Sequence, residues 1–168
     1  EEGFFPLFIK GGLPSRKMVT ICPTLSSQFV SALMLIAPAL PNGLTLTLSG
    51  KTTSRPYIDM TAQILRSVGV EVKQTKTGGV ISVGSFPVSL PLRTTVHIEK
   101  DWTSASYFYL MAALAPGKRI RLVGLSRESV QGDAIVENIF AKLGVKTVEV
   151  RSPFRRESRS LRIVASDK

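Results

Sequence analysis

Cysteine and histidine are scarce in this chain of 168 residues, which contains one of each, Cys22 and His97. A single cysteine cannot form an internal disulfide and has no second thiol with which to complete a metal site. We therefore expect Cys22 to be a small buried hydrophobic residue. His97 alternates with Val96 and Ile98, so we expect it to point from the opposite face of a strand rather than to act in catalysis. No metal or other cofactor is predicted.

Long hydrophobic runs and low-complexity tracts are also missing. The longest uncharged apolar stretch runs from Phe29 to Leu40 and is shorter than the roughly 20 residues that a membrane-spanning helix needs. The N-terminus opens with two glutamates and lacks the positive region of a secretory signal. Hydrophobic residues make up 43% of the chain and charged residues 20%, which is the composition of a globular domain. We expect a cytoplasmic protein without a membrane partner.

Acidic residues are few relative to basic ones, 12 against 22, so the formal net charge is +10. Such an excess favours anionic partners such as nucleic acids and phosphorylated metabolites. The excess is spread evenly, because residues 1–97 hold nine basic and four acidic side chains and residues 98–168 hold thirteen and eight. The densest basic cluster, residues 151–162, lacks the interleaved aromatic residues of a base-stacking platform. We interpret it as a solvated face, and we expect no nucleic-acid partner.

The order of features in the chain repeats. Residues 26–50 and 104–124 each contain hydroxyl residues, an apolar helix, a Pro/Gly turn, an alternating strand and a glycine. Residues 54–72 and 128–150 continue the parallel with a helix that ends at a glycine, as a left-handed C-cap requires, and then a strand. Repeated α/β units of this kind predict sheets that are covered by helices. Three further strands are expected, at residues 80–83, 94–98 and 160–164.

Apolar residues at helical spacing predict one apolar face on the second helix of each copy. These residues are Ile58, Ala62, Leu65 and Val68 in the first copy, and Ile135, Ile139 and Leu143 in the second.

Three polar residues, Ser26, Ser27 and Gln28, stand directly in front of the first apolar helix. One hydroxyl there is ordinary capping, because the first amide groups of a helix have no partner within it. Capping needs one such residue, however, and a helix N-terminus is also a natural seat for phosphate or carboxylate. The second copy keeps hydroxyl residues at the equivalent positions but has no glutamine. This difference suggests that the first copy binds a ligand that the second does not, in an open cleft before the helix.

A second polar cluster precedes the next helix, in the stretch KTTSRPYIDMT. Pro56 suits the first helical turn, and Ser54 is placed to cap the helix. Tyr57 then falls in the first turn, where its hydroxyl reaches a ligand or its ring packs on the sheet. The side chain of Arg55 either binds a phosphate group or faces solvent.

Several spaced motifs resemble those of the EPSP synthases, the enolpyruvyl transferases of the shikimate pathway. They are S-S-Q-F before an apolar helix, S-R-P-Y-I-D-M-T from Ser54, D-W-T-S-A-S-Y-F from Asp101, and the triplet Gln131-Gly132-Asp133. The resemblance extends from the stretch PLFIKGG to the strand after Gly144. It implies an α/β (α+β) fold of repeated βαβαβ-type units, the inside-out α/β barrel of that family, with parts of two lobes.

The resemblance also implies a division of the chain and a set of binding residues. Residues 1–97 would be part of the shikimate-phosphate-binding lobe and residues 98–168 part of the second lobe, with the crossover near 97–101. In the family, the S-S-Q-F motif binds shikimate-3-phosphate and its glutamine also reaches phosphoenolpyruvate, while the serine and tyrosine of S-x-P-Y line the shikimate-phosphate side. The matching residues here are Ser26, Ser27, Gln28, Ser54 and Tyr57.

Other motifs of the family are absent from this sequence: G-N-[SA]-G-T, D-A-A-M-T with its proton-transferring aspartate, and the later lysine and arginine motifs for phosphoenolpyruvate. Thr103 stands where the family usually has serine. The chain therefore resembles an internal fragment that is inactive alone and contains no catalytic residue, with Asp59, Asp101 and Asp133 assigned to caps and turns. The resemblance implies that the complete enzyme transfers the carboxyvinyl group of phosphoenolpyruvate to the 5-hydroxyl of shikimate-3-phosphate and releases phosphate, and we expect it to be a monomer.

Two other classes of function fit parts of the sequence. A basic α/β module that binds nucleic acid, related to the repeats of RNA 3′-phosphate cyclases, fits the net charge, although no RNP-like aromatic motif is present. The absence of catalytic groups is consistent with a structural or interaction module. A steep dependence of binding on salt distinguishes the first class, and binding of shikimate-3-phosphate distinguishes the second.

Overall fold

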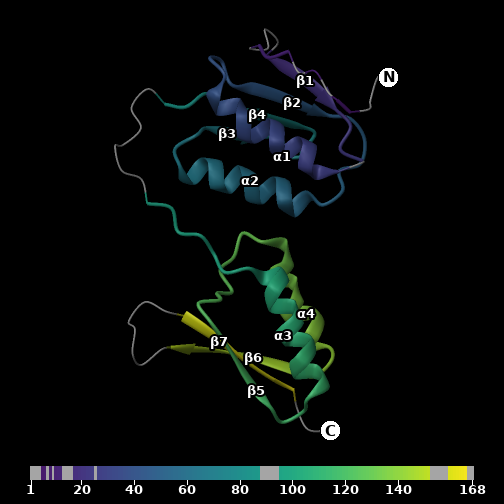
Figure 1. Ribbon diagram of the computed structural model, residues 1–168, viewed down its shortest axis with the longest axis vertical. Helices are drawn as coiled ribbons and strands as arrows, with labels where there is room; N and C mark the ends of the chain where they lie inside the picture. Colours follow the sequence, from purple (N-terminus) through teal and green to yellow (C-terminus); the bar gives the residue numbers. More distant parts are fainter. Residues whose placement is uncertain are drawn as a thin grey trace. The chain divides into compact units, whose positions relative to one another are not determined.

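The computed structural model shows two compact units (Figure 1). The first comprises residues 1–54 and 64–91, and the second comprises residues 55–63 and 92–168. Helix α2 (Arg55–Ser67) is therefore divided between the two units. The proposed division into parts of two functional lobes at residues 97–101 stays a prediction. The residues that the structure describes are 5, 6, 8, 10–12, 17–24, 26–87, 95–151 and 159–165.

The first unit contains a four-stranded sheet in the order β1-β2-β4-β3. β1 and β2 are parallel, whereas β2 and β3 each pair with β4 in antiparallel fashion. Leucines alternate with threonines along β2, and the leucines are buried, as expected of a strand with one face on a core. The elements are β1 (Met18–Ile21), α1 (Ser27–Ile36), a 3-10 helix η1 (Ala37–Ala39), β2 (Leu44–Leu48), the end of α2 (Arg55–Ser67), β3 (Val72–Gln74) and β4 (Val80–Val83). Residues 55–63 of α2 belong to the second unit.

The second unit contains a three-stranded antiparallel sheet in the order β5-β7-β6. Helices α3 and α4 cover one face of this sheet (Figure 1). The core between them is built on the stacked rings of Trp102 and Tyr109, whose centroids are 6.2 Å apart. The elements are α3 (Trp102–Leu114), β5 (Arg119–Val123), a 3-10 helix η2 (Gly132–Ile135), α4 (Val136–Ala141), β6 (Val145–Arg151) and β7 (Arg159–Ala165).

The two copies of the sequence repeat have the same order of elements, as the sequence predicts. Each runs helix, strand, helix, strand, strand, and in each the last strand lies between the other two: β2-β4-β3 corresponds to β5-β7-β6. The helix of the first copy ends before Gly69 and that of the second before Gly144, and both glycines have the positive φ of a left-handed C-cap. The strands expected at 80–83 and 160–164 are present as β4 and β7.

The prediction of a strand at residues 94–98 is wrong. Residues 95–98, including His97, are exposed and have no regular structure, and residue 94 lies outside the described residues. Among the described strands none pairs with this segment, so its backbone groups lack the ladder partners that a strand requires. Two alternating apolar residues are too short a pattern to specify a strand without such a partner.

The expectation that Cys22 is buried is also wrong. Cys22 is exposed and follows the last residue of β1, where the chain leaves the sheet. Its Sγ lies 3.0 Å from Oγ1 of Thr24. This hydrogen bond lowers the pKa of the Cys22 thiol.

The predicted apolar faces differ between the two copies. In the first, Ile58, Ala62 and Leu65 are buried. In the second, the three residues of the predicted face are half exposed or more, reaching 62% for Leu143. A second exposed apolar stripe runs along α3 at the spacing i, i+3, i+4, i+7. We call these two stripes together the helix-layer patch: Tyr107, Leu110, Met111 and Leu114 of α3, with Ile135, Ile139 and Leu143.

We expect the helix-layer patch to make the isolated chain self-associate and bind hydrophobic dyes, because large exposed apolar patches mark contact surfaces. Replacing Leu110 and Leu114 by lysine should reduce dye fluorescence several-fold and shift the chain toward monomer in analytical ultracentrifugation. The control is Leu35→Lys, which changes an exposed leucine of α1 in the first unit. Equal effects of the two substitutions would show that the association does not depend on this patch.

Candidate functional site

The parallel strands β1 and β2 place two polar clusters at one edge of the first sheet. The strands are paired in register from Met18↔Thr45 to Ile21↔Leu48. Their carboxyl ends therefore meet at the same edge, and the loops that follow them lead into α1 and α2. In open α/β sheets, ligands bind outside the carboxyl ends of parallel strands.

Hydrogen bonds hold these two loops together. The amide of Ser49 donates to the carbonyl of Ile21 at 3.0 Å. The hydroxyl of Thr53 donates to the carbonyl of Pro23 at 3.1 Å. The loop that ends at Ser26 and the loop that ends at Ser54 therefore run side by side.

Helix α1 begins at Ser27, and Ser26 is its N-cap, in agreement with the predicted helix start. Ser26 has an extended backbone, and its Oγ accepts a hydrogen bond from the amide of Gln28 at 3.1 Å. Ser27 shares the buried face of the helix with Val30 and Met34 and is only 5% exposed. Gln28 is exposed. A ligand in solvent therefore meets Ser26 and Gln28 first, at a helix start whose first turn contains no acidic residue.

Ser54 adopts an unusual backbone conformation at the start of α2. Its φ of 52° and ψ of 42° are left-handed, and it is the only residue other than glycine with a positive φ in the part of the chain that the structure describes. Its side chain forms no cap hydrogen bond, so the expected capping role is wrong. N-cap serines are normally extended, and the left-handed turn explains the missing bond. Backbone strain of this kind clusters at functional sites.

We expect Ser54→Gly to unfold at higher denaturant concentration than Ser54→Ala. A left-handed residue with a Cβ costs about 1–2 kcal/mol, and glycine removes that cost while adding about 0.5–1 kcal/mol of chain entropy in the unfolded state. The expected net difference is about 0.5–1 kcal/mol in the free energy of unfolding. Both variants lack the hydroxyl, so urea titration of the pair isolates the backbone effect. Equal stabilities would mean that the left-handed conformation of Ser54 is not strained.

Tyr57 lies in the second unit, where it contacts the Gln131-Gly132-Asp133 triplet. Its hydroxyl donates to Oδ2 of Asp133 at 3.4 Å, and the hydroxyl of Thr103 donates to the same oxygen. Tyr57 is 46% exposed. A Cβ added to Gly132 would lie 2.5 Å from Cβ of Pro56, so only glycine allows this approach. The structure thus brings three of the four resembling motifs together through Tyr57, Thr103 and Asp133, whereas Ser26, Ser27, Gln28 and Ser54 belong to the first unit.

The N-terminus of α3 already contains its own carboxylate. Asp101 is the N-cap and accepts hydrogen bonds from the amides of Thr103 at 2.9 Å and Ser104 at 3.1 Å. The hydrogen bond from the Ser104 hydroxyl is the main reason that the pKa of Asp101 is lowered. Asp101 therefore caps the helix, as predicted. The start of α1 has the neutral Ser26 at the N-cap position. Its N-terminus can therefore still bind an anion, whereas the N-terminus of α3 already binds the carboxylate of Asp101.

Sequence reasoning missed the role of Gln131. Its Oε1 accepts a hydrogen bond from the amide of Trp102 at 2.9 Å, and its Nε2 donates to the carbonyl of Lys100 at 2.8 Å. Gln131 therefore fastens the segment that leads into α3. The sequence contains no signal for this contact, because the partners are about thirty residues apart and two of them are backbone groups.

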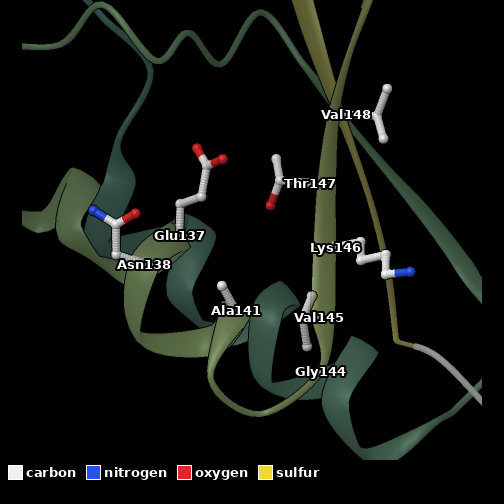
Figure 2. Close-up of a pocket in the computed structure, with 8 residues that line it drawn as sticks. All are labelled: Glu137, Asn138, Ala141, Gly144, Val145, Lys146, Thr147 and Val148. Atoms are coloured by element: carbon white, nitrogen blue, oxygen red, sulfur yellow. The ribbon is translucent and has the colours of Figure 1, made fainter.

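An open pocket of about 440 Å³ lies between α4 and β6 (Figure 2). Glu137 points into it, and Thr147 faces the same space from the strand. Arg127 donates from Nε to Oε1 of Glu137 at 2.9 Å, and this hydrogen bond raises the pKa of Arg127. None of the predicted binding residues lines the pocket. The Glu137 carboxylate in this pocket is therefore engaged in an ion pair with Arg127.

The described parts of the chain contain neither a metal-binding cluster nor a membrane-spanning helix. No group of three or more histidine, cysteine, aspartate or glutamate side chains there is placed to hold a metal ion. No described helix is long and apolar enough to cross a bilayer.

The chain matches the family model of EPSP synthase (3-phosphoshikimate 1-carboxyvinyltransferase) over residues 1–166. It is 41% identical over 147 residues to the 3-phosphoshikimate 1-carboxyvinyltransferase of Bacteroides fragilis strain YCH46, covering 88% of this chain and 35% of that protein. It is 35% identical over 144 residues to the enzyme of the same name from Cronobacter sakazakii, covering 86% and 33%. The chain thus spans about a third of the length of these relatives.

Among solved structures, the chain is similar to the 2.37 Å structure of EPSP synthase from Acinetobacter baumannii. The TM-score is 0.59 at 20% sequence identity, and the alignment covers 89% of this chain and 32% of that one. A second EPSP synthase structure from Acinetobacter baumannii gives a TM-score of 0.56 at 21% identity. These likenesses confirm the predicted fold class. The family match over almost all of its length and the repeated α/β units together show that the chain belongs to the EPSP synthase family and has its inside-out α/β fold.

Proposed function

We propose that this chain is the part of an EPSP synthase that holds shikimate-3-phosphate, through Ser26, Ser27, Gln28, Ser54 and Tyr57. The observation that carries the proposal is the pair of hydrogen-bonded loops at the carboxyl ends of β1 and β2. These loops place two of the five residues, Ser26 and Ser54, at adjacent helix starts. An N-terminal first turn without acidic residues suits a phosphate group, since its amides and dipole favour negative charge.

In this proposal four of the five residues have distinct roles. Ser26 and Gln28 offer a hydroxyl and an amide to the phosphate or ring hydroxyls of shikimate-3-phosphate, and Gln28 also reaches phosphoenolpyruvate. Ser54 is uncommitted to its own helix, so its hydroxyl remains available as a donor. Tyr57 keeps one face in solvent while its hydroxyl bonds Asp133, so it would exchange that partner for the substrate.

The complete protein would transfer the carboxyvinyl group of phosphoenolpyruvate to the 5-hydroxyl of shikimate-3-phosphate and release phosphate, in the shikimate pathway of aromatic amino acid biosynthesis. The transfer needs a base for the hydroxyl and an acid for the methylene carbon, each within hydrogen-bond reach. It also needs cations around the phosphate and carboxylate. We propose that residues outside this chain supply these groups, and that the complete enzyme is a cytoplasmic monomer without a cofactor.

Titration of the chain with shikimate-3-phosphate, followed by NMR or calorimetry, tests the binding role. Neutral hydrogen bonds contribute about 0.5–1.5 kcal/mol each, so we expect a dissociation constant of roughly millimolar order. Ser26→Ala, Gln28→Ala and Ser54→Ala should each weaken binding several-fold. Ser67→Ala, at the far end of α2, is the control. If inorganic phosphate bound as tightly as shikimate-3-phosphate, or if the three variants matched the control, the proposal would be wrong.

A further inference from the structure

The outward face of the second sheet is basic. Along β7, Leu161, Ile163 and Ala165 are buried in the core, so Arg162 and Val164 between them point to the other face. Arg162 is exposed. The central strand of this sheet therefore presents a guanidinium group to solvent.

The two outer strands add cations to the same face. On β5, Ile120 and Leu122 pack against the core, which directs Arg119 and Arg121 outward, and both are exposed. On β6, Lys146 points away from α4 while Thr147 faces it (Figure 2). We call this surface the basic sheet face: Arg119, Arg121, Lys146 and Arg162.

The strand register brings these cations close together. Arg121 lies directly opposite Arg162, and Arg119 and Lys146 flank Val164 from either side. Like charges in opposite cross-strand positions destabilise a sheet. Glu149 is the one acidic residue described on the three strands, and it is in register with the buried Leu161, which places it on the core-facing side. The basic sheet face therefore has no neutralising carboxylate among the described strand residues.

The fold itself does not require cations in these positions. In the first unit the outward pair at the equivalent place is Thr45 and Ser82, whose hydroxyls lie 3.3 Å apart. The same topology thus forms with a neutral, hydrogen-bonded pair. Cations can protect the open edges of a sheet from pairing with another chain, but Arg162 is on β7, which has a partner on both sides. Edge protection does not account for it.

We propose that the basic sheet face binds the phosphate backbone of double-stranded nucleic acid without reading its sequence. Guanidinium groups match phosphate oxygens with two parallel hydrogen bonds, and three of the four cations are arginines. Residues two apart on a strand are about 6.6 Å apart, so the face presents a compact two-dimensional array. The net charge of +10 assists the approach of a polyanion.

The composition of the face selects duplex nucleic acid over other polyanions. Its remaining described residues are valines and the fully buried Ser160, and it has no aromatic side chain on which an unpaired base could stack. It also lacks the aromatic and methionine anchors around which protein interfaces are built. The binding is independent of the proposed enzymatic role. Sequence reasoning did not expect it, because these cations come from three separate segments and only Arg162 belongs to the dense cluster at 151–162.

Fluorescence anisotropy of a labelled 20-base-pair duplex against the full chain, repeated from low to physiological salt, tests the proposal. We expect weak binding at physiological salt, with a dissociation constant of roughly 10⁻⁴–10⁻⁶ M, that tightens steeply as salt falls. The variant Arg119→Gln, Arg121→Gln, Lys146→Gln, Arg162→Gln should lower affinity at least tenfold at low salt. It should also reduce the slope of log affinity against log salt by about 3 to 4, since each phosphate contact contributes about 0.9.

A charge-matched control separates this face from net charge alone. Lys10, Lys17, Lys51 and Lys76 are exposed residues of the first unit, and their joint replacement by glutamine should leave most of the affinity. Circular dichroism should show both variants folded, and the face variant should be no less stable because it removes the Arg121–Arg162 repulsion. Equal losses in the two variants, absence of binding to the duplex, or tighter binding of poly-glutamate than of the duplex would each overturn the proposal.

Discussion

Gly43→Ala is expected to abolish the fold of the first unit. Gly43 has a φ of +64°, and a Cβ built on it would lie 2.1 Å from the carbonyl oxygen of Val83 and 2.9 Å from Cα of Gly84. Both obstacles are backbone atoms, so no side chain can move aside. Leu44, the next residue, is paired with Val83 in the sheet. The clash can therefore be relieved only by separating β2 from β4.

The expected loss of stability is large because β2 is central to the sheet and the core of the first unit. β2 is the partner of both β1 and β4, and its leucines form part of the buried core. The left-handed conformation alone costs about 1–2 kcal/mol for alanine, and loss of the strand pairing adds to it. Because small domains are stable by only about 5–15 kcal/mol, we expect Gly43→Ala to remove the cooperative unfolding transition of the first unit.

Gly69→Ala is the matched control for this substitution. Gly69 has a φ of +88°, but an added Cβ would meet only Cγ of Pro87 at 3.9 Å. Gly69→Ala therefore has the conformational cost of a left-handed alanine without the clash. It should lower the free energy of unfolding by about 1–2 kcal/mol. Urea unfolding followed by circular dichroism compares the two, while fluorescence of Trp102 reports on the second unit. If the two variants lost the same stability, the close approach of Gly43 to β4 would be wrong.

The isolated chain is expected to release no phosphate from a mixture of phosphoenolpyruvate and shikimate-3-phosphate. All three aspartates inside the resembling motifs have structural partners: Asp59 pairs with Arg55 at 3.0 Å, Asp101 caps α3, and Asp133 accepts from Thr103. Proton transfer requires groups held in one geometry with both substrates, and misplacement by about 1 Å can cost roughly a hundredfold. The chain spans about a third of its relatives, and the motifs expected to move protons are outside it.

A continuous phosphate-release assay measures this directly, with the full-length relative from Bacteroides fragilis as the positive control. Extending the present chain by the missing segments should restore turnover. Ser26→Ala and Ser54→Ala in the extended protein should then raise KM for shikimate-3-phosphate more than they lower kcat, because these residues are proposed to bind the substrate. Turnover of the unextended chain near that of ordinary enzymes, about 1–1000 per second, would show that a catalytic group within it has been overlooked.

The sequence by itself determined the features that depend on neighbours along the chain. The helix start at Ser27 and its cap follow from a polar triplet before an apolar run, because the first amides of a helix need acceptors nearby. The C-terminal glycines and the strand at 80–83 follow from equally local patterns. The repeat and the family resemblance also needed only the order of motifs. The five binding residues remain predictions of that resemblance.

Tertiary structure alone decided the features that depend on partners distant in the sequence. The segment at 95–98 has strand-like alternation, but none of the described strands pairs with it. Ile139 has a helical apolar spacing but is 50% exposed. Serine is a standard capping residue, but Ser54 adopts a left-handed conformation. Only the path of the surrounding loops imposes this conformation. The pairing of Arg121 with Arg162 likewise required the strand register. Burial, register and backbone strain are set by contacts between segments, so no local pattern specifies them.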